Sequence, residues 1–204
     1  MTHALYFAPG ACSLAPNIVL REAGIPFDLV RVDLRQKKLA TGESYLAINP
    51  NGYVPALRLP DGSVLTEAAV MLQYIADQRP EAKLAPPPAG TMERYRFQEK
   101  LNFIATELHK GTSPLYNPAA GDDFKAALKA RLASRFEYLA SFVRDGYIMG
   151  GLTAADGYAF YILRSWQHAH KEDLTRWPAL VDYYQRMAVR PAVVAALASE
   201  GLQA

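Results

Sequence analysis

The segment Arg79-Pro80-Glu81-Ala82-Lys83-Leu84-Ala85-Pro86-Pro87-Pro88-Ala89-Gly90 divides the sequence into two parts that follow different patterns. It holds four prolines and a glycine in twelve residues. Because proline lacks a backbone N–H and restricts the residue before it, neither a helix nor a strand can run through the segment. We therefore expect a first domain at residues 1–80, a linker at 81–91 and a second domain at 92–204.

Before the linker, short apolar runs alternate with amphipathic stretches. The pattern predicts strands at 5–7, 27–32, 54–59 and 63–65, and helices at 14–23, 41–48 and 67–79, of which 41–48 is the weakest. Pro60-Asp61-Gly62 is a strong hairpin-turn signal between the last two strands. This order predicts an α/β domain with a parallel first pair of strands in a mixed four-stranded sheet.

After the linker the sequence shows only helical periods, which predict an all-α domain. We expect helices at 92–111, 124–143, 153–166, 177–189 and 191–199. In the first of them one apolar stripe is formed by Phe97, Leu101, Ile104 and Leu108. The third should begin with a capping box, because Thr153 is followed three residues later by Asp156.

The composition excludes several classes of protein. The chain has 204 residues, a formal charge of +2, 50% hydrophobic residues and one cysteine. One cysteine forms neither an internal disulfide nor a cysteine-based zinc ribbon, and the hydrophobic content suits a packed core. The sequence has no basic run typical of nucleic-acid binders and no membrane-length apolar run, and we expect no signal peptide, because the N-terminal residues lack a basic stretch followed by a long apolar one. We expect a cytoplasmic protein that binds neither nucleic acid nor membrane.

Cys12 is the first candidate for chemistry. It follows a strand and the Pro9-Gly10 turn and lies just before a helix. Backbone N–H groups and the macrodipole at a helix start favour an anion, so a thiol placed there is expected to titrate at a lower pH than usual. A lone cysteine is also often a small buried hydrophobe. Position alone leaves the two interpretations about equal.

Two further segments have the potential to bind a peptide-like ligand. If the Val54–Pro55 bond is cis, the turn exposes the backbone N–H and C=O of Val54 to an extended peptide; a trans proline at a strand edge is the more frequent case. At Glu67-Ala68, a ligand carboxylate could bind the N–H of Ala68 while Glu67 binds an ammonium group. Acidic residues also stabilise the first turns of ordinary helices.

The helix at 92–111 has a polar face off its apolar stripe, formed by Asn102, Thr106, His109 and Lys110. Asn102 and His109 are seven residues apart, so a regular helix places them on nearly one side, about 10.5 Å apart along its axis. This face is either an ordinary solvated surface, the more frequent case, or the wall of a cleft against the first domain. His168 and His170 do not share a helical face, and we predict no metal site.

Five stretches of the sequence resemble the bacterial beta-class glutathione S-transferases, in order and spacing, over essentially the whole chain. They are Pro9-Gly-Ala-Cys-Ser-Leu14, Asn49-Pro-Asn-Gly-Tyr-Val-Pro-Ala-Leu57, Leu65-Thr-Glu-Ala68, Leu101-Asn-Phe-Ile-Ala-Thr-Glu-Leu-His-Lys-Gly111 and Leu152-Thr-Ala-Ala-Asp156. The Pro-Gly-Ala-Cys-Ser and Glu-Leu-His-Lys-Gly pieces are specific to that class. The resemblance implies a thioredoxin-like N-terminal domain, an all-helical C-terminal domain, a homodimer, and glutathione as co-substrate without a metal.

The resemblance also implies roles for residues of the first domain. Cys12 matches the class cysteine, which contacts the glutathione sulfur and can form a mixed disulfide with it. Val54 and Pro55 match the cis-proline turn that pairs with the cysteinyl backbone of glutathione. Glu67 and Ala68 match the pair that holds the γ-glutamyl group. The family often has Ser or Gly where Ala68 stands, so one hydroxyl donor is expected to be missing.

Four other matches complete the implied glutathione site. Lys37 matches a lysine near the glycyl carboxylate. Asn102, His109 and Lys110 match residues of the C-terminal domain around the thiol and glutathione, and His109 is the residue that assists at the sulfur.

The function implied is conjugation of glutathione to hydrophobic electrophiles, with possible glutathione-dependent thiol–disulfide exchange through Cys12. Pro114, Tyr116 and Trp166 are expected to line the apolar half of the cleft, where the electrophile binds. The alternative is a non-catalytic glutathione-binding or regulatory protein on the same fold, because a fold does not determine a function. A specialised glutathione lyase, isomerase or dehalogenase is a third and weaker option.

Overall fold

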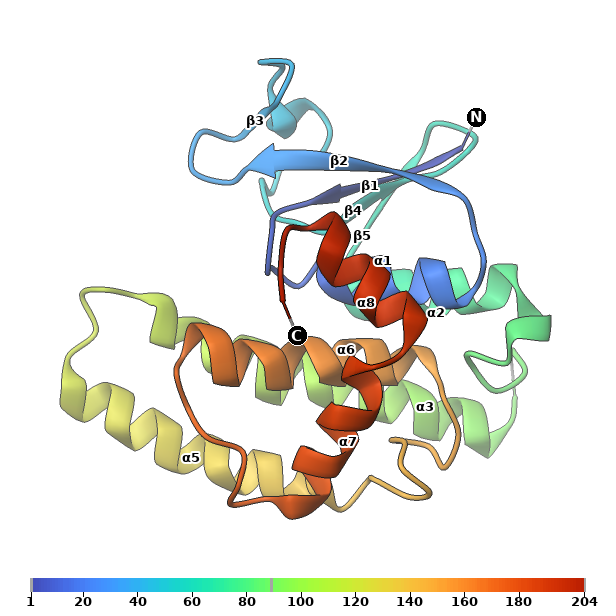
Figure 1. Ribbon diagram of the computed structural model, residues 1–204. Coiled ribbons are helices and arrows are strands. Elements are labelled where there is room, and N and C mark those ends of the chain that lie inside the picture. The colour runs from blue at the N-terminus through green and yellow to red at the C-terminus, as the bar shows by residue number, and fades with distance from the viewer. Residues whose placement is uncertain (1, 89, 204) are drawn as a thin grey trace.

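The computed structural model describes residues 2–88 and 90–203. Figure 1 shows a sheet-containing domain above a helical one. The strands are β1 (His3–Phe7), β2 (Phe27–Asp33), β3 (Lys38–Leu39), β4 (Ala56–Arg58) and β5 (Val64–Thr66). The α-helices are α1 (Leu14–Glu22), α2 (Ala68–Gln78), α3 (Met92–Phe103), α4 (Lys110–Thr112), α5 (Asp122–Ala140), α6 (Ala154–Arg164), α7 (Pro178–Ala188) and α8 (Pro191–Ser199).

The sheet has the strand order β3-β2-β1-β4-β5. β1 and β2 are parallel, as the first strand–helix–strand unit predicts, and the other neighbouring pairs are antiparallel. The predicted mixed sheet is confirmed, but it has five strands and not four, because the two-residue strand β3 pairs with β2 at one edge. So short a strand has no alternation that a sequence pattern can reveal.

The predicted helix at 41–48 is wrong. Only Tyr45–Ala47 is helical there, as a single 3-10 turn. Gly42 has a φ of +89°, which is left-handed backbone, and Ser44 is extended. Both conformations are incompatible with a continuous right-handed helix.

The helical domain contains every helix expected after the linker, with shifted ends. The apolar stripe of α3 and the segment after it is buried throughout, from Phe97 to Leu108. The stripe is nevertheless not carried by one regular helix, because residues Ile104–His109 form a π-helical segment between α3 and α4. Within the described residues, no helix is both long enough and apolar enough to span a membrane.

The start of α6 carries the predicted capping box. Asp156 is fully buried, and its carboxylate accepts from the backbone N–H and the hydroxyl of Thr153 at 2.7 and 3.0 Å. The other carboxylate oxygen accepts from the N–H of Ile148 at 2.9 Å. Burial raises the pKa of Asp156 to about 6. One side chain thus satisfies two buried backbone donors and ties the preceding loop to the helix.

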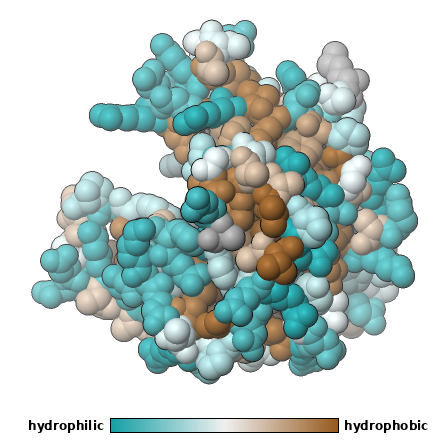
Figure 2. Space-filling view, in the orientation of Figure 1, coloured by the Kyte–Doolittle hydropathy of each residue, from teal (hydrophilic) through white to brown (hydrophobic). Residues whose placement is uncertain are grey.

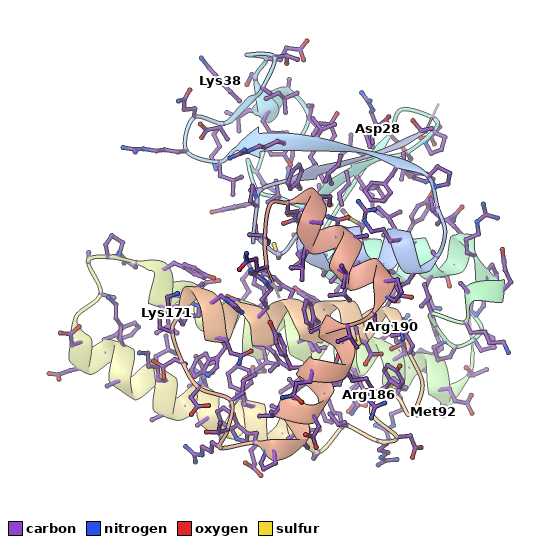
Figure 3. All side chains as sticks on the ribbon, viewed as in Figure 1. Asp28, Lys38, Met92, Lys171, Arg186 and Arg190 are labelled. Carbon is purple, nitrogen blue, oxygen red and sulfur yellow. The ribbon has the colours of Figure 1, made fainter. Side chains whose placement is uncertain are left out.

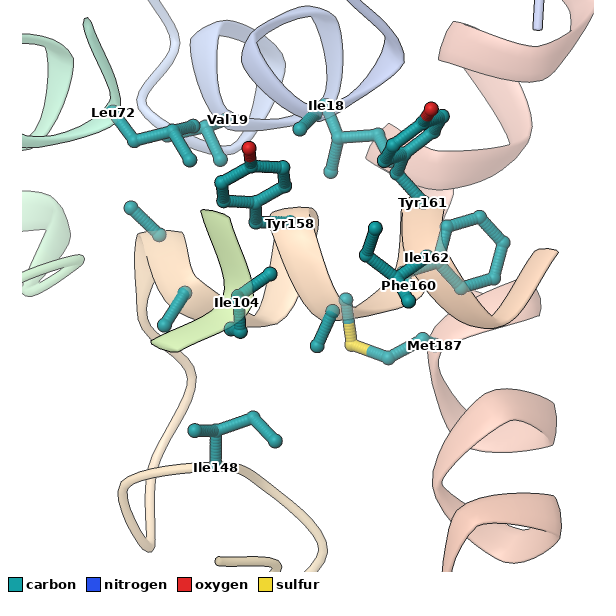
Figure 4. Packing of buried hydrophobic residues seen from close by; sticks show 14 of the residues in the cluster. Ile18, Val19, Leu72, Ile104, Ile148, Tyr158, Phe160, Tyr161, Ile162 and Met187 are labelled. Carbon is teal, nitrogen blue, oxygen red and sulfur yellow. The ribbon is translucent and has the colours of Figure 1, made fainter. Parts of the chain in front are cut away.

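Helix α1 is packed between the sheet and the helical domain. An added Cβ at Gly157 of α6 would lie 2.8 Å from a methyl group of Val19 and 3.3 Å from the carbonyl oxygen of Ala15, both on α1. Glycine therefore permits an approach of the two helices that any larger residue would prevent. Figure 4 shows Tyr158 and Tyr161 of α6 directed towards α1, beside Ile18 and Val19.

Polar groups at the two ends of α8 tie the second domain to α1 and to the loop before it. Arg190, labelled in Figure 3 at the start of α8, forms a two-pronged ion pair with Glu22 at 2.7 and 2.9 Å. At the other end of α8, the Glu200 carboxylate accepts from the N–H of Gly10 and from the Asn17 amide, each at 3.0 Å. The loop that leads into α1 is therefore held by the last part of the chain.

The capping box generates a stability prediction. Asp156→Ala should lower the free energy of unfolding by about 3 kcal/mol, because it removes the helix cap and leaves the buried N–H groups of Ile148 and Thr153 without an acceptor. Urea denaturation measures the difference. Asp182→Ala removes an exposed aspartate from α7 and should stay within about 0.5 kcal/mol of the parent protein. Equal losses for the two variants would contradict the role given to Asp156.

Candidate active site

A cleft opens between the two domains, and Figure 2 shows the surface hollowed there on the left of the view. Its walls come from the loop before α1, the loop before β4, the start of α2, the π-helical segment with α4, and α6. The lining residues include Cys12, Asn49, Asn51, Tyr53, Val54, Pro55, Thr66, Glu67, Ala68, Ala105, Thr106, His109, Lys110 and Tyr158. Seven of the residues proposed from the sequence are therefore brought together: Cys12, Val54, Pro55, Glu67, Ala68, His109 and Lys110.

The thiol of Cys12 lies at the base of this cleft. It donates a hydrogen bond to the carbonyl oxygen of Val54 at 3.2 Å. Burial raises its pKa to about 12, although the backbone N–H groups of Cys12 and Ser13 and the Lys110 ammonium act in the opposite direction. The expected lowering of the thiol pKa is therefore wrong for the ligand-free protein: the desolvation cost of a thiolate exceeds the attraction of the helix start.

The loop before β4 presents backbone groups to the cleft in a fixed arrangement. The Val54–Pro55 peptide bond is cis. The carbonyl oxygen of Tyr53 accepts from the Tyr45 hydroxyl and from the Asn49 amide, both at 2.8 Å. These two bonds hold the backbone just before the cis bond, so Val54 faces the cleft in one orientation.

Glu67 precedes the first residue of α2 with a φ of +65°, a left-handed conformation that is uncommon for a residue other than glycine. Its carbonyl oxygen accepts from the N–H groups of Val70 and Met71. The N–H groups that precede Val70 in the first turn, beginning with Ala68, have no carbonyl partner within the helix. The turn therefore places a carboxylate beside free backbone donors on the cleft wall, which suits a ligand with both an ammonium and a carboxylate.

The π-helical segment decides which polar residues of the predicted helix reach the cleft. A π-helix has more residues per turn than an α-helix, so the regular 3.6-residue spacing does not hold across Ile104–His109. His109, Lys110 and Thr106 line the cleft, whereas Asn102 is exposed on α3 outside it. The contact of Asn102 with glutathione that the resemblance implies stays a prediction, whereas His109 and Lys110 are on the cleft wall.

His109 is held by an aromatic residue of α6. Its Nδ1 lies 2.8 Å from the hydroxyl of Tyr158, and the rings of Tyr158 and Tyr161 meet it edge-on with centroids 5.8 and 5.4 Å away. Burial, reinforced by the neighbouring Lys110 ammonium, lowers the pKa of His109 to about 4. The imidazole is therefore neutral at physiological pH.

Two lysines flank the exposed ring of Tyr53 at the mouth of the cleft. The ammonium of Lys37 lies 5.4 Å from the ring centroid and that of Lys110 lies 5.7 Å from it. Lys37 also donates to the carbonyl oxygen of Gly52 at 2.7 Å. The two cations come from different domains and attract anionic ligand groups to the same side of the cleft.

The residues proposed for the electrophile are not among those that line this cleft. Trp166 is only 3% exposed and packs against Phe136 in the helical core, with ring centroids 4.8 Å apart. Tyr116 bonds to the hydroxyl of Ser165 at 2.6 Å and its ring contacts His170. Pro114 is half-buried in the same 3-10 turn as Tyr116. The placement of Trp166 contradicts its proposed contact with a ligand.

Sequence reasoning missed several lining residues, among them Asn49, Asn51 and Tyr158. Asn49 and Asn51 stand in an Asn-Pro-Asn-Gly run that reads as a turn, and nothing in that pattern indicates a cleft. Tyr158 is in a helix that is buried all round, so its hydroxyl is hidden among apolar neighbours. A buried tyrosine that requires a hydrogen-bond partner is the one available signal. In residues 2–88 and 90–203, no three His, Cys, Asp or Glu side chains are grouped to hold a metal ion.

Fold and site together define a transferase of the glutathione-binding type. A thioredoxin-like sheet presents a cis-proline turn beside a cysteine, and a helical domain closes the cleft with a histidine. Residues 10–78 match the family model "Glutathione S-transferase, N-terminal domain", and residues 108–200 match "Glutathione S-transferase, C-terminal domain".

Curated relatives and solved structures agree with these matches. Glutathione S-transferase GstA of Escherichia coli O157:H7 is 44% identical over 98% of this chain and 99% of its own. The structure described as a ternary complex of BphK, a bacterial GST, is 48% identical, with a TM-score of 0.93 and coverage of 98% of this chain and 100% of that one. A sphingomonad glutathione S-transferase complexed with glutathione is 43% identical, with a TM-score of 0.91 and coverage of 98% and 99%.

The chain belongs to the glutathione S-transferase family. Its resemblance to the bacterial beta class is confirmed by the class enzyme of Sphingomonas chungbukensis, which is 43% identical, with a TM-score of 0.91 and coverage of 98% of this chain and 99% of that one.

The environment of Cys12 predicts low reactivity in the ligand-free protein. With a thiol pKa near 12, the thiolate fraction at pH 8 is about one in 10⁴, and alkylation by iodoacetamide should accelerate roughly tenfold per pH unit up to at least pH 10. Mass spectrometry follows the reaction without ambiguity, because the chain has one cysteine. Free glutathione in the same tube is the reference thiol. A Cys12 rate that levels off below pH 8 would disprove the buried, protonated thiol.

Proposed function

We propose that this protein conjugates glutathione to hydrophobic electrophiles, with Cys12 adding glutathione-dependent thiol–disulfide exchange. The observation that supports the proposal is the meeting of Cys12, the cis Val54–Pro55 turn, Glu67 and His109 on one cleft, although they come from four separate parts of the chain. Full-length relatives named as glutathione transferases support the same chemistry.

Glutathione would bind extended along the cleft floor. Its γ-glutamyl ammonium would meet the Glu67 carboxylate, and its γ-glutamyl carboxylate would meet the first N–H groups of α2. Its cysteinyl backbone would pair with Val54 as an added strand. Its glycyl carboxylate would lie towards Lys37 and Lys110, and its thiol towards Cys12 and His109. Ala68 offers its backbone N–H but no hydroxyl, so the ligand would have one hydrogen bond fewer there than with serine.

In conjugation, the glutathione thiol loses its proton to water, and the thiolate attacks an electrophilic carbon while the leaving group departs with the bonding electrons. Backbone N–H groups at the start of α1 stabilise the negative sulfur. In exchange, a Cys12 thiolate attacks one sulfur of glutathione disulfide, which forms the Cys12–glutathione disulfide and releases one glutathione thiolate. We also propose a cytoplasmic homodimer, on the strength of the family resemblance.

The ligand assignment predicts stabilisation by glutathione. At a concentration near one hundred times Kd, glutathione should raise Tm by roughly 5–10 °C, because binding adds about 2.7 kcal/mol to a chain of this size. Glu67→Gln should bind at least tenfold more weakly, since it loses the charged partner of the ligand ammonium. Glu137→Gln, which changes an exposed carboxylate on α5, is the matched control. A Tm that glutathione leaves unchanged would rule out the proposed site.

Measurement of disulfide exchange and of conjugation separates the role of the Cys12 thiol from that of the glutathione thiol. Cys12→Ala should abolish disulfide exchange, because the chain holds no other cysteine. Conjugation to a chromogenic aromatic electrophile should persist in the same variant, since the attacking thiol belongs to glutathione. Both rates are measured on one preparation. Persistent exchange in Cys12→Ala would refute the exchange role, and glutathione binding without any turnover would favour the non-catalytic alternative.

A further inference from the structure

The hydrogen bond between His109 and Tyr158 bears on which ring nitrogen of His109 carries the proton. No sequence pattern reveals this position. A neutral imidazole carries its proton on one nitrogen only, and a hydrogen bond to the other nitrogen decides which. The Tyr158 hydroxyl lies 2.8 Å from Nδ1 of His109. Either Nδ1–H donates to the phenol oxygen, or the phenol O–H donates to an unprotonated Nδ1.

The surroundings of Tyr158 distinguish the two arrangements. Its side chain is 2% exposed and contacts His109 through its only hydrogen bond among the described residues. If Nδ1–H were the donor, the phenol hydrogen would be left buried with no acceptor among the described residues, at a cost in free energy. If the phenol donates, both groups are satisfied. Burial also raises the pKa of Tyr158, so the hydroxyl keeps its hydrogen.

We propose that Tyr158 is a positioning residue that fixes the tautomer of His109, so that Nδ1 accepts from the tyrosine hydroxyl and Nε2 carries the proton towards the cleft. His109 then acts at the glutathione sulfur as a hydrogen-bond donor and does not take up the thiol proton. The assignment of the proton stands on the geometry of His109 and Tyr158 alone. Its consequence for the sulfur rests on the proposed function.

The ring of His109 has several titratable neighbours besides Tyr158. Lys110 follows it along the chain, Tyr161 of α6 packs edge-on against it, and Cys12 and Glu67 line the same cleft. The Lys110 ammonium disfavours a charged imidazole. A donor N–H that faces the cleft without a positive charge on the ring stabilises a thiolate and leaves the histidine unprotonated at Nδ1.

Nitrogen NMR of the ligand-free protein tests the proton assignment directly. In protein labelled with ¹⁵N at histidine, His109 should show one protonated nitrogen at Nε2 and one unprotonated nitrogen at Nδ1. Its signals are assigned by their loss in His109→Gln. In Tyr158→Phe the two nitrogen shifts should move towards each other, because both tautomers become populated. The pKa of His109 should rise, since the lost hydrogen bond stabilised the neutral ring.

The matched control is Tyr161→Phe. This variant also removes a buried hydroxyl from a ring packed on His109, but Tyr161 makes no hydrogen bond to Nδ1. Its His109 nitrogen shifts should equal those of the parent protein. Both variants retain the aromatic ring, and circular dichroism with thermal unfolding shows that each is folded before its spectra are compared.

The kinetic readout is the pH dependence of conjugation. In Tyr158→Phe, kcat/KM at pH 6.5 should fall roughly three- to tenfold, and its rise with pH should shift upward by about half a unit to one unit, because one hydrogen bond to the sulfur is weakened. A structural defect alone would lower kcat/KM at every pH equally.

Two results would overturn the proposal: a protonated Nδ1 on His109 in the parent protein, or unchanged nitrogen shifts in Tyr158→Phe. If the parent protein shows the expected nitrogen shifts but no turnover, the proposed function is refuted and the proton assignment is still supported.

Discussion

The close contact of α1 with α6 at Gly157 is the constraint on which the site depends. Cys12 lies just before α1, and Tyr158 follows Gly157 on α6, so the distance between the two helices sets the distance between the sulfur and the residue that orients His109. The sheet holds one side of α1, and the ion pair of Glu22 with Arg190 holds its far end. The two domains therefore form one mechanical unit around the cleft, although the sequence divides them at a proline-rich segment.

The cleft combines two neutral groups, the Cys12 thiol and the His109 imidazole, with a few charges at its rim. Burial opposes ionisation of both Cys12 and His109, because it raises the pKa of the thiol and lowers the pKa of the imidazole. Each group is uncharged until a ligand brings its own charges and partners into the cleft. The charged residues Glu67, Lys37 and Lys110 lie where the polar ends of glutathione would be bound. Such a division keeps the reacting sulfur in an apolar environment, where each hydrogen bond to it has a larger effect than in water.

Local signals predicted most of the fold, because alternating and helical periods, the Pro-Asp-Gly turn and the Thr153–Asp156 pair each act over a few residues. The predictions of local structure that failed also have physical causes within a few residues. Gly42 interrupts a predicted helix with left-handed backbone, and a strand as short as β3 has no pattern. At the site, a 3.6-residue period does not reveal the π-helical segment Ile104–His109, so sequence spacing alone does not fix the relative positions of Asn102 and His109. The thiol pKa was misjudged because burial depends on what packs around Cys12. The place of Tyr158 on the cleft wall could not be predicted, because the hydrogen-bond partner of its hydroxyl is known only from the structure.

The hydrogen bonds of Glu200 connect the segment after α8 to the loop that carries Cys12. Gly10 and Asn17 depend on this one carboxylate, and the carbonyl oxygen of Gln203 accepts from Arg164 at 2.8 Å. A truncation that begins at residue 200 would leave the N–H of Gly10, two residues before Cys12, without its acceptor, and the Asn17 amide would keep only the Ser199 hydroxyl. None of the deleted side chains at 200–203 lines the cleft, yet the loop that carries the sulfur would lose its anchor.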